Sequence, residues 1–199
     1  NLKERGLRGV EFAVSDAHEG LEKALRASFP GCIWSRCHAH FQRNVLDKTP
    51  SGCHDQMKDL LDRVLEADSQ QEAVERFEEE ADELQEEAPD AVEVLKDGLF
   101  DATAVLDLPE KYHRWLRTTN MLERLIQEIR RREKVIRIFP SKDSAWRLVG
   151  ALLAEKHEEW STSRRYLRTD EFYDWLDEQT DTEATDFQSE PTNRTLQPA

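Results

Sequence analysis

The pattern of apolar and polar residues predicts strand, helix, strand and helix in the first quarter of the chain. Residues 10–15 alternate apolar with polar or small side chains, which is the period of a strand. Residues 21–28 carry apolar side chains at helical spacing, and Pro30 then ends the helix. We expect a second short strand at 32–37 and a short helix at 38–46.

The middle of the chain, residues 55–106, has helical periodicity and no strand pattern. Two amphipathic stripes predict helices that bury one face and expose the other. The stripes consist of Leu60, Leu61, Val64 and Leu65, and then of Val74, Phe77, Ala81, Leu84 and Ala88. Most of the other positions are Glu, Asp or Gln, so this segment should be a helical unit with an acidic outer face.

The last part of the chain is also mostly helical in its pattern. Apolar positions predict a helix at 120–133, and the apolar run at 134–140 predicts an extended segment that stops at a proline. A long amphipathic helix is expected at 141–160 and a short one at 169–179. Residues 180–199 are polar without periodicity, which predicts disorder.

Charge is unevenly distributed along the 199 residues. The net charge is -14 overall. It is +2 over residues 1–54, -16 over 55–110, +8 over 111–168 and -8 over 169–199. Because salt screens each charge beyond about 8–10 Å, the basic segment can face a polyanion while the acidic segments stay solvated.

The composition indicates a soluble, cytoplasmic protein with no membrane partner. No signal peptide or long apolar run is present, and 38% apolar residues suffice for a core. Cys32, Cys37 and Cys53 are too few for a disulfide framework, so we expect free thiols or metal ligands.

Two carboxylates each admit two interpretations. Asp16 follows the first strand, where it can bind a divalent cation, or it can cap the next helix together with Glu19. Glu123 stands three residues after Asn120, which is also a capping pattern, and it is a second candidate metal ligand. At both positions the local sequence by itself favours the capping interpretation over a metal ligand.

A run of basic residues follows Glu123 at helical or near-helical spacing. Arginine suits bidentate contacts with phosphate, so these residues are candidates for nucleic-acid binding. They are Arg124, Arg130, Arg131, Arg132, Lys134 and Arg137. The alternative is that the acidic helical segment neutralises them within the molecule.

A zinc site is a further hypothesis from the residues alone. Cys37, His40, Cys53 and His54 supply four ligands of the right type. Their spacing matches no common zinc finger, since two of them are adjacent in sequence. The alternative is that these side chains pack at the end of a strand.

Four blocks of the sequence, in this order, resemble the Mutator-type DDE transposases of bacterial and archaeal insertion sequences. The blocks are "GVEFAVSDAHEGLEKAL", "RCHAHFQRN", "LRTTNMLERLIQEIRRREKVIRIFP" and "AWRLVGALLAEKHEEW". The resemblance extends over about residues 2–168. It implies an RNase H-like catalytic core in which three carboxylates bind two Mg²⁺ ions, with Mn²⁺ as a substitute, and a helical domain inserted before the last carboxylate.

The resemblance assigns roles to particular residues. Asp16 matches the second catalytic aspartate and Glu123 the catalytic glutamate, so both are expected metal ligands. Cys37 and His40 match the Cys-x-x-His signature of the family, which we treat as a supporting element near the site. Asn120 is expected to cap the helix and so to hold Glu123 in place.

The expected fold class is α/β, with a partial RNase H-like core that lacks its first strands and an all-helical insertion, helix-dominated overall. Residues 1–54 form the first half of the core and 55–110 the acidic insertion. Residues 111–168 supply basic helices that complete the core, and 169–199 an acidic helix and a disordered tail.

The expected function is Mg²⁺-dependent phosphoryl transfer, with DNA cleavage and strand transfer at the element ends and a target. The resemblance places the first catalytic aspartate upstream of this chain, so we expect the chain to be inactive alone and the full-length protein to form a homo-oligomer. The alternatives are a non-catalytic DNA-binding or regulatory remnant and an acidic helical interaction protein with a small zinc site.

Overall fold

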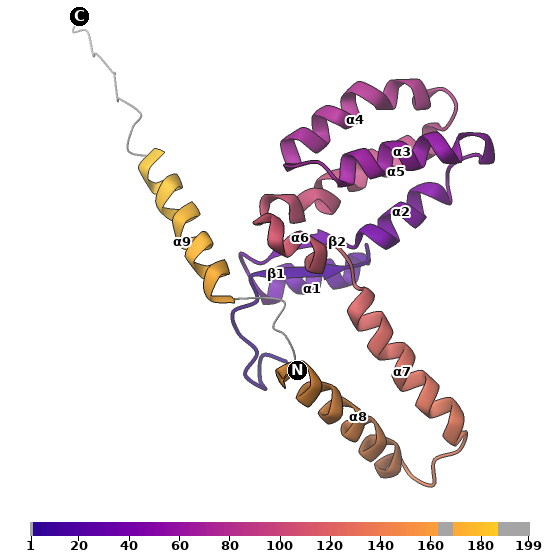
Figure 1. Cartoon of the computed structure of the whole chain (residues 1–199), viewed down its shortest axis with the longest axis vertical. Helices are drawn as coiled ribbons and strands as arrows, with labels where there is room; N and C mark the ends of the chain where they lie inside the picture. The colour runs from indigo at the N-terminus through magenta and orange to yellow at the C-terminus, as the bar shows by residue number, and fades with distance from the viewer. Residues whose placement is uncertain (1, 163–168, 187–199) are drawn as a thin grey trace, which may run out of the picture. The chain divides into compact units, whose positions relative to one another are not determined.

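The computed structural model describes residues 2–162 and 169–186 and consists mainly of helices (Figure 1). The chain divides into two compact units, Asn1–Lys156 and His157–Ala199. The last helix, α9 (Thr169–Asp186), continues past residue 180, so the prediction of disorder is wrong up to its end. The remainder of that prediction, 187–199, lies outside the described residues.

The two predicted strands form a parallel pair. β1 (Phe12–Ser15) and β2 (Ile33–Arg36) align residue for residue, beginning with Phe12 opposite Ile33. α1 (Glu19–Ser28) connects them, as a parallel pair requires a crossover between its strands. The first three predicted elements are therefore confirmed.

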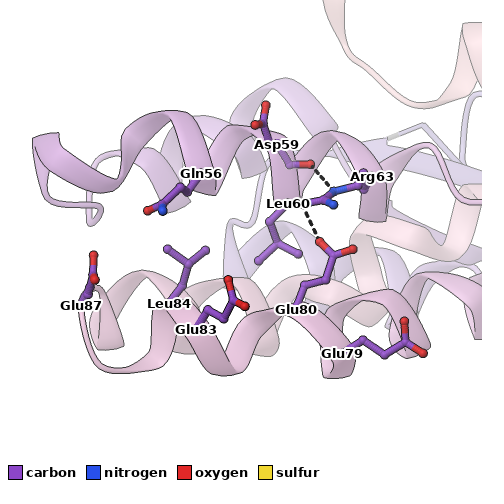
Figure 2. A pocket seen from close by; sticks show the side chains of 9 residues that line it. All are labelled: Gln56, Asp59, Leu60, Arg63, Glu79, Glu80, Glu83, Leu84 and Glu87. Carbon is purple, nitrogen blue, oxygen red and sulfur yellow. Dashed lines mark hydrogen bonds and ion pairs between the residues drawn. The ribbon is translucent and has the colours of Figure 1, made fainter.

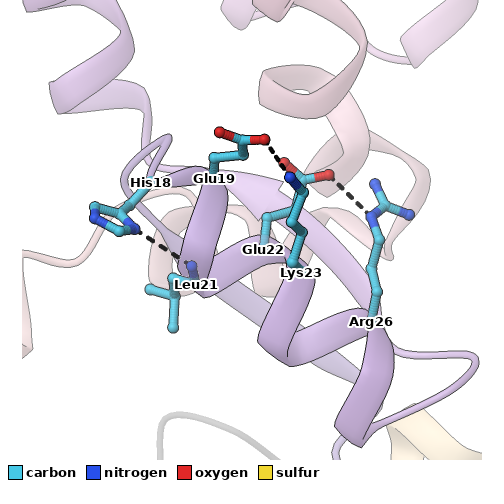
Figure 3. Close-up of polar contacts among 6 residues, drawn as sticks. All are labelled: His18, Glu19, Leu21, Glu22, Lys23 and Arg26. Atoms are coloured by element: carbon cyan, nitrogen blue, oxygen red, sulfur yellow. Dashed lines mark hydrogen bonds and ion pairs between the residues drawn. The ribbon is translucent and has the colours of Figure 1, made fainter.

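His18, rather than Asp16, caps α1. The Nδ1 atom of His18 accepts a 3.3 Å hydrogen bond from the backbone N–H of Leu21 (Figure 3). The outer face of the helix carries two ion pairs at four-residue spacing, which are Glu19–Lys23 and Glu22–Arg26. Asp16 is exposed, and none of the described residues forms a hydrogen bond or ion pair with its carboxylate. The capping interpretation of Asp16 is therefore wrong.

The helical body follows β2. Its elements are α2 (His38–Leu46), the 3₁₀ turn η1 (Ser51–Cys53), α3 (His54–Leu65), α4 (Gln70–Gln85), α5 (Pro89–Thr103) and the 3₁₀ turn η2 (Ala104–Asp107). α5 packs against α2, α4 and β2, and α3 packs against α2 and α4, so these helices lie side by side (Figure 1). The helical body thus covers β2 and holds it in place.

The core lies between these helices, where both predicted stripes point inward. The largest fully buried side chains include Phe41, Met57, Leu60, Leu61 and Leu95. Each such side chain contributes about 1.5–3 kcal/mol relative to an exposed one. The second stripe differs from the prediction only at its first position, where Ala73 is buried and Val74 half-buried.

Three more helices follow in order, α6 (Glu110–Leu116), α7 (Asn120–Ile136) and α8 (Lys142–Thr162). α7 buries no residue completely, and much of its apolar side is exposed. It continues through Ile136, so the extended segment predicted at 134–140 is wrong for its first three residues. The helix ends where Arg137 adopts a φ of 61°, and Ile138 N–H donates to the Ile136 carbonyl at 2.7 Å.

A helix-dominated fold with a small parallel sheet is confirmed. The RNase H-like core stays a prediction, as do the segment boundaries drawn from charge. Within the described part of the chain, no helix combines the length and apolar character needed to cross a membrane.

Candidate active site

The candidate site is at the edge of the sheet where both strands end. Because β1 and β2 are parallel, their carboxyl ends meet there, and ligand sites of α/β sheets favour that edge. The backbone N–H of Cys37 donates a 2.7 Å hydrogen bond to the carbonyl of Ser15. This bond places Asp16, the next residue, close to the start of α2.

A buried serine holds the end of β1. The hydroxyl of Ser15 accepts a hydrogen bond from Nε1 of Trp34 at 2.9 Å and donates one to the carbonyl of Asp16 at 2.8 Å. Both Ser15 and Trp34 are buried. The backbone of Asp16 is thus fixed while its carboxylate remains exposed.

The start of α7 is attached to the same edge. The backbone N–H and the hydroxyl of Thr119 each lie 3.4 Å from the sulfur of Cys37, 82 positions earlier in the sequence. The backbone N–H of His38 donates to the carbonyl of Arg117 at 2.9 Å. These contacts bring the first turn of α7, and with it Glu123, to the end of β2.

Two side chains contact the carboxylate of Glu123. The hydroxyl of Thr119 donates to Oε1 at 2.9 Å, and Nε2 of His40 lies 3.8 Å from the same oxygen. The side chain of Glu123 is 42% exposed, so it can still reach a ligand. Glu123 also donates its backbone N–H to the carbonyl of Thr119 at 3.0 Å, the first hydrogen bond of the helix.

Asn120 does not cap α7. Thr119 occupies the N-cap position, and Asn120 is the first residue of the helix. The physical reason is the attachment to Cys37, which fixes the backbone of Thr119, so the N-cap position lies one residue before the predicted cap and Asn120 is already helical. The side chain that holds Glu123 is therefore a threonine.

Cys37 and His40 lie on the first turn of α2, facing the start of α7. Cys37 is fully buried. Burial raises the pKa of its thiol, but hydrogen bonds from Thr119 and from the backbone N–H of His40 outweigh burial and lower this pKa below its ordinary value. Nδ1 of His40 is buried and has no hydrogen-bond partner in the described part of the chain. His40 thus lies beside Glu123, and Cys37 contacts Thr119, which in turn contacts Glu123.

The donor set at this edge suits a hard cation. Mg²⁺ is commonly held by one or two carboxylates and keeps several waters, and Asp16 and Glu123 supply two carboxylates. Residues 2–162 and 169–186 contain no cluster of three or more His, Cys, Asp or Glu side chains able to hold a metal ion. That Asp16 and Glu123 share an ion stays a prediction.

The four-residue zinc site is wrong, because its members have separate partners. The thiol of Cys53 donates to Oε2 of Glu87 at 3.2 Å, and this hydrogen bond raises the pKa of the thiol. Nε2 of His54 bonds to the carbonyl of Thr49 at 2.9 Å. Cys37 and His40 face α7 instead. The alternative of packing at the end of a strand holds for Cys37, which follows β2, but not for Cys53 and His54, which lie where η1 meets α3.

The basic residues of α7 and of the turn after it are all exposed. Two of them share one carboxylate, since Glu128 bonds to Nε of Arg131 at 2.7 Å and to Nε of Arg132 at 2.8 Å. These arginines hold the pKa of Glu128 at about 2. Arg124, Arg130, Lys134 and Arg137 form no ion pair with any described residue, so they are open to an external anion.

The acidic helical segment does not neutralise α7. Its glutamates line a cleft of about 400 Å³ between α3 and α4 (Figure 2). The cleft has its own cation, because Arg63 pairs with Glu80 at 2.7 Å. No ion pair among the described residues joins this segment to α7, so the intramolecular alternative for the basic residues is wrong.

Sequence reasoning missed Thr119 and Ser15. A threonine four residues before a helical glutamate faces it across one turn, and that spacing was a usable signal for Thr119. No local signal identifies Ser15, whose hydroxyl meets Trp34 through the pairing of two strands.

The sequence of the chain is similar to those of known transposases. It matches the profile described as "Transposase, Mutator family" over residues 1–163. It is 40% identical over 173 residues to the transposase for insertion sequence element IS256 in transposon Tn4001 of Staphylococcus aureus, covering 85% of this chain and 44% of that protein. It is 37% identical over 167 residues to the transposase for IS1081 of Mycobacterium tuberculosis, covering 84% and 40%.

A third relative is similar to this chain to about the same extent. The transposase for ISRM5 of Rhizobium meliloti is 38% identical over 170 residues, which cover 85% of this chain and 43% of that protein. The chain thus spans less than half the length of these relatives. The family match covers both strands, the helical body, the start of α7 and its basic residues. The chain belongs to the Mutator family of transposases.

Proposed function

We propose that this chain forms part of the catalytic region of a DDE transposase and acts in Mg²⁺-dependent phosphoryl transfer on DNA. The observation that carries the proposal is the chain of contacts from Ser15 through Cys37 and Thr119 to Glu123. These contacts bring Asp16 and Glu123, which are 107 positions apart in the sequence, to one edge of a parallel sheet. In this proposal, that edge belongs to the RNase H-like core that the resemblance implies.

The protein residues have separate roles in this proposal. Asp16 and Glu123 offer carboxylate oxygens to Mg²⁺, which when bound would lower the pKa of a water and neutralise charge on the reacting phosphate. His40 lies against Oε1 of Glu123, and Cys37 anchors the start of α7. In this proposal Cys37 and His40 support the position of Glu123, and the two carboxylates hold the cation.

The exposed basic residues of α7 would bind the DNA backbone. They begin one residue after Glu123 and continue along the helix, so a bound duplex would run from the candidate site along α7. Phosphate contacts of this kind position DNA without reading its sequence. The element ends and target DNA are proposed as the partners, and a homo-oligomer as the form of the full-length protein.

The proposal is tested by Mn²⁺ binding to the chain, measured by electron paramagnetic resonance of the free ion. Asp16→Asn and Glu123→Gln should each weaken binding by about tenfold or more, as removal of a ligand does. Glu19→Gln and Glu133→Gln are matched controls, since they remove one carboxylate each from α1 and α7. Equal Mn²⁺ affinity in all four variants would overturn the metal role of both residues.

A strand-transfer assay with Mg²⁺ or Mn²⁺ and labelled element ends tests the reaction itself. We expect the chain alone to bind DNA and metal without joining DNA strands. Metal-dependent joining that disappears in Glu123→Gln would instead show that this chain is sufficient for the reaction.

A further inference from the structure

The hydroxyl of Thr119 lies between two functional side chains of the candidate site. Its oxygen is 2.9 Å from Oε1 of Glu123 and 3.4 Å from the sulfur of Cys37. The backbone N–H of the same threonine points to that sulfur, also at 3.4 Å. One residue therefore contacts both the candidate metal ligand and the buried cysteine of the family signature.

The number of hydrogens fixes the direction of these bonds. A carboxylate only accepts, so the single hydrogen of the Thr119 hydroxyl goes to Glu123. With the thiol neutral, the hydroxyl oxygen is then an acceptor for the S–H of Cys37, and only a thiolate would take the hydroxyl hydrogen instead. The sulfur in turn accepts from the backbone N–H of Thr119. Thiol, hydroxyl and carboxylate thus form a chain of hydrogen bonds that ends on the acceptor Oε1 of Glu123.

We propose that Thr119 is a positioning residue that holds Oε1 of Glu123 and leaves Oε2 for the ligand. The inference rests on the proposed function, since the ligand would be the divalent cation. Oε2 of Glu123 forms no hydrogen bond or ion pair with any described residue, whereas Oε1 has both Thr119 and His40 as neighbours. In this proposal Oε1 of Glu123 is held by the protein, and Oε2 binds the cation.

Both the backbone and the hydroxyl of Thr119 help it to hold the side chain of Glu123 in one position. A glutamate on the first turn of a solvated helix has several rotamers, and fixing a long side chain in one of them costs conformational entropy. Thr119 is β-branched and therefore stiff at χ1, and its N–H is bound to a fully buried sulfur. The hydroxyl thus restrains Glu123 from a fixed point before any ligand binds.

The test compares Thr119→Val with Thr119→Ser. Valine keeps the shape and branching but removes the hydroxyl, and serine keeps the hydroxyl. Partners that orient a metal ligand typically contribute a factor of 10–100 in affinity, so Thr119→Val should weaken Mn²⁺ binding about tenfold and Thr119→Ser less than about threefold. Thr118→Val is the matched control and should bind as the unmodified chain does.

A structural role alone predicts a different result. If Thr119 only stabilised the start of α7, Mn²⁺ affinity would follow the free energy of unfolding, and both substitutions would act alike. Equal affinity of Thr119→Val and the unmodified chain would overturn the proposal. Loss of affinity in Thr119→Ser equal to that in Thr119→Val would also overturn it.

A second measurement needs no metal and separates this inference from the proposed function. In protein labelled with ¹³C at glutamate carboxyls, the Glu123 signal is assigned by its absence in Glu123→Gln. That signal should move in Thr119→Val and stay in Thr119→Ser, while the signal of Glu128 stays in both. If Mn²⁺ binding does not depend on Glu123 at all, the proposed function fails, and the carboxyl signal alone decides the role of Thr119. An unmoved Glu123 signal in Thr119→Val would then refute it.

Discussion

The guanidinium of Arg36, the last residue of β2, occupies the space beside Gly98 on α5. A Cβ atom on Gly98 would lie 1.9 Å from Nη1 of Arg36 and 2.4 Å from the ring of Phe41. The guanidinium also lies over that ring, 5.4 Å from its centre. The close approach of α5 to the end of β2 thus depends on a residue without a side chain.

We therefore expect Gly98→Ala to destabilise the helical body. The ring of Phe41 is fully buried and cannot move aside, so overpacking should cost about 1–3 kcal/mol. The measurement is the free energy of unfolding in urea. Gly52→Ala is the control, because no atom lies within 4 Å of the added methyl group there. Equal stability of the two variants would contradict the packing at Gly98.

Protonation of His38 should weaken the fold in acid. Burial holds its pKa at about 4, and the positive charges of Arg117 and His113 also lower it, whereas the hydrogen bond to the carbonyl of Ala102 raises it. Between about pH 4 and 6.5 the unfolded chain binds a proton at this residue and the folded chain does not. The contribution of His38 to stability is therefore lost as the pH falls through this range, by about 3 kcal/mol in total.

This pH effect is measured as a difference between variants. Glutamine can still donate to Ala102 but does not titrate, so in His38→Gln the fall in unfolding free energy between pH 7 and 4 should be smaller than in the unmodified chain. His157→Gln, which replaces an exposed histidine, should leave the fall unchanged. Parallel stability curves for His38→Gln and the unmodified chain would show that His38 titrates normally.

Loss of two arginines from α7 should weaken DNA binding at all sequences. Each phosphate contact releases counterions, so Arg130→Ala with Arg131→Ala should reduce the slope of log affinity against log salt by about two. Fluorescence anisotropy with duplexes of unrelated sequence measures the slope. The control removes the same charge from α1, by Lys23→Ala with Arg26→Ala (Figure 3). An unchanged slope in the α7 variant would exclude these arginines from DNA contact.

Glu128 should restrain the same DNA binding. It engages Arg131 and Arg132 and stays ionised well below neutral pH. Glu128→Gln should therefore tighten non-specific DNA binding and steepen its salt dependence. The matched control is Glu22→Gln, which frees Arg26 on α1 from a similar four-residue pair and should have little effect. Weaker binding by Glu128→Gln would mean that the glutamate orients its arginines for DNA.

Local patterns predicted most elements because the period of apolar residues follows directly from burial. The change from alternation to helical spacing located β1 and α1, and the stripes located α3 and α4. The end of α7 was missed because the branched residues Val135 and Ile136, which favour strands, continue a helix when its hydrogen bonds remain intact. Propensity is a weak preference there, with no buried contact to oppose the helix.

The candidate site was predicted only in part, since its contacts join distant segments. The resemblance identified Asp16, Glu123, Cys37 and His40. Capping rules chose Asn120, because Asn, Ser and Thr are similar caps in sequence. The attachment to Cys37, 82 positions away, places Thr119 at the N-cap position, where its hydroxyl bonds to Glu123 and not to a backbone N–H. Contacts between residues so far apart in the sequence produce no periodic pattern of apolar residues from which they could be predicted.

The sharp turn at Arg137 has a consequence for the choice of residue there. A φ of 61° with a hydrogen bond across two residues is the strained form of a γ-turn, which glycine adopts without steric cost. An arginine in this conformation lowers the stability of the folded chain by about 1–3 kcal/mol. The backbone conformation alone would favour glycine at this position. The reason for an arginine must therefore lie in its long cationic side chain. That exposed side chain follows directly after α7, which extends the row of positive charge beyond the end of the helix.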